Sequence, residues 1–151
     1  MTHGGGKSST LQPICYIRTM PKSVPIGVRG TASETVAFEN TLTFRHPELP
    51  PVYSTPDMIR LMETAAFHAL QPYCEEGEIT VGTAINVEHR AATGIGVNVE
   101  ADATLESFDG KFYILRVSAR DGRQQIGRGT VTRTFVNPAK VAERHAKRGE
   151  G

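Results

Sequence analysis

The sequence predicts an α+β fold in which one long central helix is wrapped by a five-stranded antiparallel sheet. Three observations predict it. One stretch that begins near residue 55 carries a wide apolar arc at helical spacing, and five other stretches alternate apolar and polar residues with a period of two. Asp-Gly pairs separate the last three of these stretches, as is typical of β-hairpins. A chain of 151 residues is long enough to bury one core.

The first strand is expected within residues 34–44, "ETVAFENTLTF". Alternation places five of its residues on one side, namely Val36, Phe38, Asn40, Leu42 and Phe44. The next stretch, "RHPELPPVYS", contains three prolines, which do not fit regular structure. We therefore expect an irregular connection between this strand and the helix.

The long helix is expected to begin at Thr55. Thr55 is a candidate N-cap, Pro56 then occupies the first helical position, and Asp57 lies in the first turn. The apolar arc consists of Met58, Ile59, Leu61, Met62, Ala65, Ala66, Ala69 and Leu70. Arg60, Thr64 and Gln71 project to the opposite face. A helix with so wide an apolar arc needs a large concave partner.

Four further strands are expected over residues 79–91, 96–107, 111–120 and 127–136. Alternation places Val81, Thr83, Ile85, Val87 and His89 on one side of the first of these. It places Val97, Val99, Ala101, Ala103 and Leu105 together in the second. Asp109-Gly110 and Asp121-Gly122 are the expected hairpin turns. The segment "PAKVAERHAKR" that follows predicts a short basic helix.

One long helix followed by an antiparallel meander predicts a single layer of sheet curved around that helix, which is the hotdog arrangement. Residues 24–151 are expected to form this domain, and the Gly-rich, polar residues 1–23 a disordered N-terminal extension. An open sheet leaves edge strands that can pair between copies of the chain. We therefore expect a homodimer, with the strand beginning at Ile79 as the candidate shared edge.

Composition limits the partners and the compartment. The formal net charge of +1 implies no general attraction to nucleic acid or to an anionic membrane. Apolar runs fall short of a transmembrane span, and the N-terminus lacks a signal-peptide core. Two scattered cysteines, Cys15 and Cys74, do not make a disulfide framework or a zinc site. We expect a cytoplasmic protein with no metal and no cofactor.

Three polar residues are candidates for catalysis. Helical projection places Glu63 at the margin of the apolar arc, and alternation places His89 on the inward side of its strand. A threonine, a carboxylate and a histidine together could activate a hydroxyl or a water molecule. Each also has a plain structural interpretation: Thr55 as a helix cap, Glu63 as a boundary residue and His89 as a hydrogen-bonded rim histidine. Spacing alone does not show that they meet.

The segment from Val52 to Gly94 resembles the thioesterases related to fluoroacetyl-CoA thioesterase, a hotdog-fold family, and the resemblance extends from about Gly27 to Lys147. That family carries a threonine before its helix, a glutamate in an L-M-E run and a histidine in an N-V-x-H-x-A-A-T run. Here these are Thr55, Glu63 and His89, at matching separations.

The resemblance implies a dimeric hydrolase of acyl-CoA thioesters with Thr55, Glu63 and His89 as the catalytic set. Thr55 could attack the thioester directly, or it could position a water molecule that His89 or Glu63 deprotonates. Backbone N–H groups at the helix start would suit the developing oxyanion. The substrate-binding residues expected are Gly82, Arg133, Leu49 and Arg90; the first two match the family's glycine in V-G-T and its arginine after the G-x-G-T strand.

One departure bears on the substrate. The fluoroacetyl specialist has phenylalanines ahead of its threonine, whereas this chain has His46 and Leu49 at the corresponding places. We therefore expect a short-chain or unspecified acyl-CoA and not fluoroacetyl-CoA in particular. Two alternatives remain open: a non-catalytic acyl-CoA-binding hotdog protein, and a hotdog hydratase or dehydratase acting on enoyl-CoA. The second usually carries a local Asp-x-x-x-x-His motif, which this sequence lacks. The cations near the C-terminus (Lys140, Arg144, Lys147, Arg148), or Arg90 next to His89, are candidates for contacts with the CoA phosphates.

Overall fold

The computed structural model describes residues 22–149 of the chain. The expectations for residues 1–21, which form most of the predicted N-terminal extension, lie outside these described residues. In chain order the elements are β1 (Arg29–Thr35), the 3-10 turn η1 (Phe38–Asn40), α1 (Leu42–Arg45), α2 (Thr55–Leu70), the 3-10 turn η2 (Gln71–Tyr73), β2 (Ile79–His89), β3 (Asn98–Phe108), β4 (Tyr113–Arg120), β5 (Gln125–Val136) and α3 (Pro138–Gly149).

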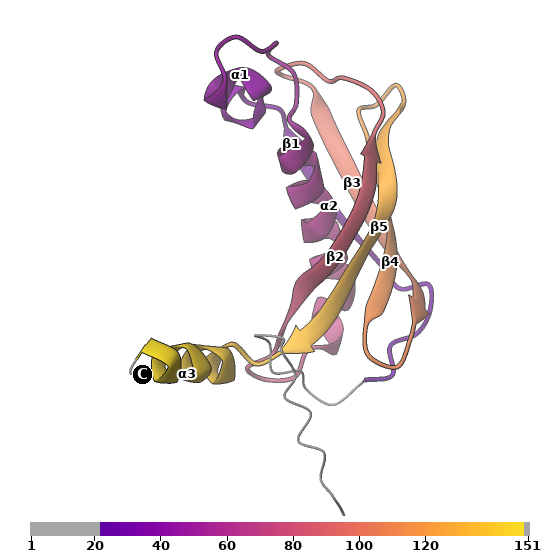
Figure 1. Ribbon diagram of the computed structural model, residues 1–151. Coiled ribbons are helices and arrows are strands. Elements are labelled where there is room, and N and C mark those ends of the chain that lie inside the picture. The colour runs from indigo at the N-terminus through magenta and orange to yellow at the C-terminus, as the bar shows by residue number, and fades with distance from the viewer. Residues whose placement is uncertain (1–21, 150–151) are drawn as a thin grey trace, which may run out of the picture.

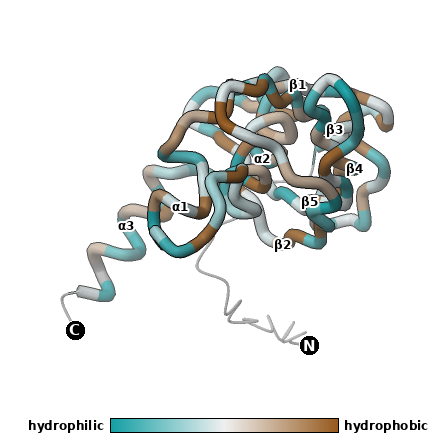
Figure 2. The backbone as a smooth tube through the Cα atoms, turned by 90° about the horizontal axis from the view of Figure 1, so that it is seen from above, coloured by the Kyte–Doolittle hydropathy of each residue, from teal (hydrophilic) through white to brown (hydrophobic). Residues whose placement is uncertain are grey.

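The strands form one antiparallel sheet in the order β1-β3-β4-β5-β2. The sheet curves around α2, and α3 projects away from the body beyond the end of β5 (Figures 1 and 2). This is the hotdog arrangement that the sequence predicts. β2 and β1 are the two edge strands, and β2 is the longer one, with 11 residues against seven.

The core lies between α2 and the concave face of the sheet. The helix contributes its buried arc of Met58, Leu61, Met62, Ala65, Ala66, Ala69 and Leu70, as predicted except for the half-buried Ile59. Strand β3 contributes Val99, Ala101, Ala103 and Leu105, which the alternation of its sequence placed together. Small residues on both surfaces, such as Ala65 and Ala69 on the helix and Ala101 and Ala103 on β3, let the helix pack close to the sheet.

The first strand differs from the prediction. Residues 34–44 form not one strand but the end of β1, the turn η1 and the helix α1. The Asn40 side chain accepts a hydrogen bond from the Ala37 N–H at 2.9 Å, which closes a turn where the strand was expected. Phe38 and Phe44 are about half exposed and pack edge to face on each other.

The true first strand, "RGTASET", has no apolar alternation, because it packs closely against the small-residue side of α2. A Cβ atom added at Gly30 would lie 2.2 Å from the Ala65 carbonyl oxygen and 2.3 Å from the Ala69 nitrogen. Only glycine allows so close an approach of strand to helix. Strand β1 therefore has small side chains where the other strands have large apolar ones, and the sequence pattern did not predict it.

The two predicted hairpin turns are confirmed. Gly110 and Gly122 have positive φ angles of 94° and 88°, a region that favours glycine. The Asp109 side chain accepts hydrogen bonds from the N–H groups of the next turn residues, and Asp121 does the same in the second turn. These hydrogen bonds hold the pKa of each aspartate below its ordinary value.

Strand β2 contains a bulge that the sequence pattern did not predict. Gly82 pairs with Arg133 and Ala84 pairs with Thr132, so Thr83 is an extra residue without a partner on β5. Residues 80 and 82 therefore face α2 before the bulge, and residues 85, 87 and 89 face it afterwards. The prediction that Val81 and Thr83 share the face of His89 is wrong. The bulge instead places Gly82 and His89, which are seven residues apart, on the same face.

Candidate active site

The start of α2 holds Thr55 with its side chain free for chemistry. The predicted cap at Thr55 is wrong: Ser54 is the N-cap, and its hydroxyl accepts a hydrogen bond from the Asp57 N–H at 3.1 Å. Thr55 is thus the first helical residue and Pro56 the second. Because the neighbouring serine caps the helix, the Thr55 hydroxyl is available to another partner. The Ser-x-x-Asp spacing could have signalled this cap.

A polar network anchors this end of the helix to β1 and η1. Arg60 donates to both carboxylate oxygens of Glu34, at 2.7 and 2.6 Å, and the buried Tyr53 hydroxyl donates to the same carboxylate. Asn40 donates to Asp57 at 3.1 Å. Burial is the main cause that raises the pKa of Tyr53, so its hydroxyl keeps its proton. These contacts fix the helix start, and with it the position of Thr55.

Thr55 and His89 come together in the structure. The Thr55 Oγ1 lies 2.8 Å from His89 Nδ1, at hydrogen-bond distance. They line a pocket of about 290 Å³ together with Tyr53, Arg90 and apolar side chains from α1, from the segment before α2 and from the segment after β2. A hydroxyl within hydrogen-bond distance of an imidazole at a helix start is the arrangement expected of an activated nucleophile or of a site that positions water.

The ring of His89 is partly enclosed by the protein. Its Nε2 atom is buried and has no hydrogen-bond partner among residues 22–149. Burial lowers the pKa of His89 from the ordinary value of 6.5, because a charged imidazolium is poorly solvated there. His89 is therefore mainly neutral near pH 7, the state in which a histidine can accept a proton.

Glu63 lies in a second pocket, of about 350 Å³, together with Gly82 and Arg133. Arg133 is almost fully buried, and Thr80 accepts hydrogen bonds from its Nε at 3.0 Å and its Nη2 at 2.8 Å. The remaining Nη1 lies 3.6 Å from Glu63 Oε1. Burial lowers the pKa of Arg133, yet a guanidinium remains charged at neutral pH. A fixed cation and a half-exposed carboxylate thus face one small opening.

Gly82 is what leaves room for the Glu63 carboxylate. A Cβ atom at position 82 would lie 2.1 Å from Glu63 Oε1 and 3.2 Å from its Cδ. The carboxylate therefore lies directly over the backbone of β2. The sequence placed Glu63 at the margin of the apolar arc, and its side chain is 32% exposed, as that position predicts.

Within one chain, Glu63 is separated from Thr55 and His89. Eight residues along a helix correspond to about 12 Å of rise, and the two pockets have no lining residue in common. Two of the three predicted catalytic residues therefore meet, and the third lies further along α2.

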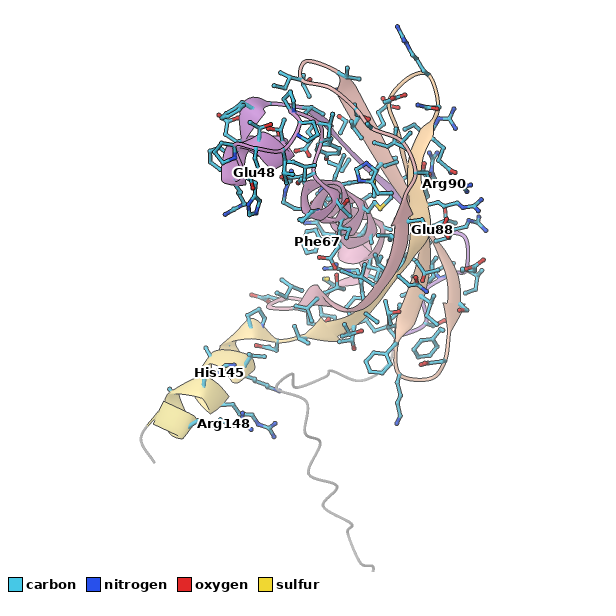
Figure 3. All side chains as sticks on the ribbon, turned by 45° about the horizontal axis from the view of Figure 1, so that its top comes forward. Glu48, Phe67, Glu88, Arg90, His145 and Arg148 are labelled. Carbon is cyan, nitrogen blue, oxygen red and sulfur yellow. The ribbon has the colours of Figure 1, made fainter. Side chains whose placement is uncertain are left out.

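The other two predicted binding residues lie apart from each other. Arg90 lines the Thr55–His89 pocket, and its side chain is about half exposed beside Glu88 at 3.9 Å. Figure 3 labels Glu88 and Arg90 near the end of β2, and Phe67 on α2. Leu49 is 39% exposed on the connection between α1 and α2 and does not line this pocket.

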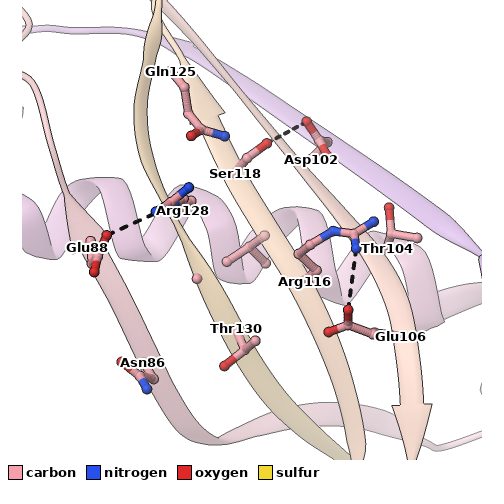
Figure 4. Close-up of a pocket in the computed structure, with 12 residues that line it drawn as sticks. Asn86, Glu88, Asp102, Thr104, Glu106, Arg116, Ser118, Gln125, Arg128 and Thr130 are labelled. Atoms are coloured by element: carbon pink, nitrogen blue, oxygen red, sulfur yellow. Dashed lines mark hydrogen bonds and ion pairs between the residues drawn. The ribbon is translucent and has the colours of Figure 1, made fainter.

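A larger groove, of about 590 Å³, lies on the face of the sheet away from α2 (Figure 4). Four of its charged residues form two pairs: Arg116 lies 3.4 Å from Glu106, and Arg128 lies 3.7 Å from Glu88. The groove holds no hydroxyl–histidine pair, so the two smaller pockets are the candidate site. Among the described residues no cluster of His, Cys, Asp or Glu could hold a metal ion. No helix of that part of the chain is long and apolar enough to span a membrane.

Comparison with known proteins places this geometry in a family. The family model described as fluoroacetyl-CoA-specific thioesterase matches residues 36–139. The chain belongs to that family. A fluoroacetyl-CoA thioesterase from Streptantibioticus cattleyicolor is 39% identical over 127 residues, which cover 80% of this chain and 91% of that protein. The resemblance inferred from the sequence is thereby confirmed.

Solved structures support the same assignment. The fluoroacetyl-CoA thioesterase FlK matches with a TM-score of 0.76 and 36% identity, covering 83% of this chain and 98% of that one. A Thermus thermophilus protein described as a thioesterase superfamily member matches with a TM-score of 0.78 and 28% identity, covering 86% and 96%. A mutant of FlK was solved in complex with fluoroacetate and CoA; it is 39% identical, with a TM-score of 0.70 over 78% of this chain and 98% of that one.

Proposed function

We propose that the protein hydrolyses acyl-CoA thioesters to the free acid and CoA, with Thr55, His89 and Glu63 as its catalytic residues. The observation that carries this is the 2.8 Å contact between Thr55 Oγ1 and His89 Nδ1 at the start of α2. Membership of the thioesterase family and the likeness to a relative solved with CoA support the substrate class. A binding protein without turnover would not need a hydroxyl held against a neutral imidazole.

The start of α2 also offers a place for the oxyanion. The N–H groups of Asp57 and Met58 are used by the Ser54 side chain and carbonyl, and Pro56 has no N–H. The N–H of Thr55 is therefore the first-turn donor left for the thioester oxygen, at the positive end of the helix dipole. Two routes fit this geometry: attack by the Thr55 hydroxyl, and attack by a water molecule that Thr55 positions and His89 deprotonates.

The site is completed by a second copy of the chain. Strand β2 is the longer free edge of the sheet, and its residues 83–86 are exposed. Antiparallel pairing of two β2 strands about Asn86 sets Ala84 opposite the partner's Glu88. Because Thr83 is bulged, the next pair is Gly82 and the partner's His89, and both face the helix side of the sheet. Glu63, which covers Gly82, then lies at the partner's Thr55–His89 pair.

The acyl group is short-chain or unspecified, and fluoroacetyl selectivity is not part of this proposal. His46 and Leu49 are largely exposed and stand where the fluoroacetyl specialist carries aromatic residues. The proposed compartment is the cytoplasm, which fits the free thiol of Cys74.

Release of free thiol from a panel of acyl-CoAs of increasing chain length tests the proposal. Wild-type protein should turn over at least one short acyl-CoA with a kcat in the usual enzyme range of about 1–1,000 per second. Binding of the same acyl-CoAs without release of thiol would contradict hydrolysis and favour the acyl-CoA-binding alternative. Hydration of an enoyl-CoA with the thioester intact would favour the hydratase.

The pH profile of kcat/KM should report the state of His89. Burial lowers its pKa, so the neutral base is present down to a lower pH than for an ordinary histidine. The acid limb of the profile should therefore have its midpoint below 6.5. By the same linkage, the folded state resists protonation of His89, so stability falls as pH drops below the ordinary pKa. A midpoint above the ordinary value would contradict this assignment of the base.

The substitution Gly82→Ala should change the position of the Glu63 carboxylate without lowering the stability of the fold. The new methyl group would displace the Glu63 carboxylate, which is the far end of a flexible side chain. We expect Tm within a few degrees of wild type and kcat lower by roughly tenfold or more, since small misplacement of a catalytic group is costly. Gly94→Ala is the matched control, because a Cβ there meets nothing within 4 Å. Unchanged kcat in a folded Gly82→Ala protein would show that the carboxylate position does not matter.

A further inference from the structure

We propose that α3 of each subunit binds the phosphates of the CoA held in the partner subunit's Thr55–His89 site. The proposal rests on the proposed function and extends it to residues far from the reacting atoms. It starts from two features of α3: its charge pattern and the point at which it leaves the sheet.

The cations of α3 form one stripe. Lys140, Arg144 and Arg148 are spaced four residues apart, so they lie on the same side of the helix. Lys140 and Arg144 are exposed. Figure 3 shows the helix, with His145 and Arg148 labelled, projecting beyond the sheet. A row of exposed cations on a helix that projects from the body can contact a polyanion.

The starting point of α3 places this stripe at the partner's site. The helix follows directly on β5, whose last residue, Val136, pairs with Ile79 at the beginning of β2. In the pairing about Asn86, Gly82 lies opposite the partner's His89, where β2 ends, and residues 79–81 extend from there toward the partner's residues 90–92. Arg90 and Ala92 line the Thr55–His89 pocket. The α3 of one subunit thus begins one strand away from the mouth of the other subunit's pocket.

The substrate has a matching charge distribution. The thioester end of an acyl-CoA is uncharged, whereas the nucleotide end carries a diphosphate and a 3′-phosphate. With the thioester at Thr55, the nucleotide end extends out of the pocket, toward the side on which the partner's α3 begins. Lys22 pairs with Glu78 at 2.5 Å and with Glu75 at 3.5 Å, and so offsets part of the negative charge of the turn at residues 75–78. Such contacts act mainly through attraction that salt screens.

The test compares KM for two substrates in the double variant Lys140→Gln/Arg144→Gln. For an acyl-CoA, KM should rise on the order of fivefold at low salt, as expected for two exposed charge contacts, with kcat nearly unchanged. For the matching acyl-pantetheine, which has no phosphates, KM should not change. The increase for acyl-CoA should shrink as ionic strength rises. The control Arg29→Gln/Lys111→Gln removes the same charge at β1 and the β3–β4 hairpin, away from the β2 edge, and should leave both KM values unchanged.

Subunit mixing tests whether α3 acts on the partner. In heterodimers of the Thr55→Ala chain and the Lys140→Gln/Arg144→Gln chain, the one active site combines an intact Thr55 with an intact α3 from the other subunit. Its KM for acyl-CoA should be that of wild type. A raised KM in these heterodimers would place α3 at its own subunit's site and overturn the proposal.

Two further results would also overturn it. One is an unchanged KM for acyl-CoA at low salt in the double variant, or after deletion of residues 138–151; a raised KM in Arg90→Gln alone would then assign the phosphates to Arg90. The other is an equal rise in KM for acyl-pantetheine, which would indicate a structural effect. Absence of turnover in the wild-type protein would instead contradict the proposed function itself, so the two failures are distinguishable.

Discussion

Substitution of His89 by alanine should lower kcat for an acyl-CoA by about a hundredfold or more, the scale expected when a general base is lost. Thr55→Ala and Glu63→Gln should have effects of the same order, because in the proposed mechanism the three residues act as one unit. None of the three changes removes a core side chain, since Thr55 is exposed and Glu63 and His89 are half-buried. Folding measured by circular dichroism and the oligomeric state should therefore be unchanged.

Variants of Thr55 distinguish the two routes. Thr55→Ser keeps the hydroxyl beside His89 Nδ1 and should retain much of the activity on either route. Thr55→Cys should accumulate an acyl-enzyme, visible by mass spectrometry, only if the side chain attacks the thioester directly. A folded His89→Ala protein with near-wild-type kcat would show that His89 is not the base, and the catalytic assignment would be wrong.

The parts of the fold that the sequence predicted have strong local signals. The wide apolar arc of α2, the alternation of β3 and the two Asp-Gly turns are each readable within a dozen residues. Strand β1 has no such signal, because it packs against α2 through small residues such as Gly30. The alternation in residues 34–44 was misleading, since its two aromatic residues, Phe38 and Phe44, are half exposed and pack on each other.

The apolar and polar pattern of β2 did not predict the bulge at Thr83 either. The bulge nevertheless determines which residues of β2 face the candidate site. Without it, Gly82 and His89 would lie on opposite faces of β2. Register in a sheet depends on the neighbouring strand, here β5, and a pattern within β2 alone cannot report it. The resemblance to the family predicted that Gly82 and His89 belong to one site, which the alternation within β2 did not.

The separation of Glu63 from Thr55 follows from the sequence by simple geometry. Two residues that are eight positions apart on one helix cannot lie side by side, because the helix rises about 12 Å between them. A threonine and a glutamate at this spacing act on one substrate only if the substrate spans that distance or if two chains contribute. The free β2 edge favours the second arrangement, and under the proposed function the dimer is then a condition of catalysis.

The most direct test of this shared site is recovery of activity when two inactive chains are mixed. Thr55→Ala and Glu63→Gln homodimers should each be nearly inactive. In a heterodimer, one site combines Thr55 and His89 of the Glu63→Gln chain with Glu63 of the Thr55→Ala chain, and is intact. Random exchange at equal concentrations makes half of the dimers mixed, with one of two sites restored, so activity should rise to about a quarter of wild type.

Two controls accompany the measurement. Sedimentation should show dimers before and after exchange, and mixing Thr55→Ala with His89→Ala should restore nothing, because both residues belong to the same half of the site. Recovery to about a quarter of wild-type kcat in the first mixture alone is the result expected of a site built from two subunits. No recovery in exchanged dimers, or a stable monomer with full activity at micromolar concentration, would contradict it.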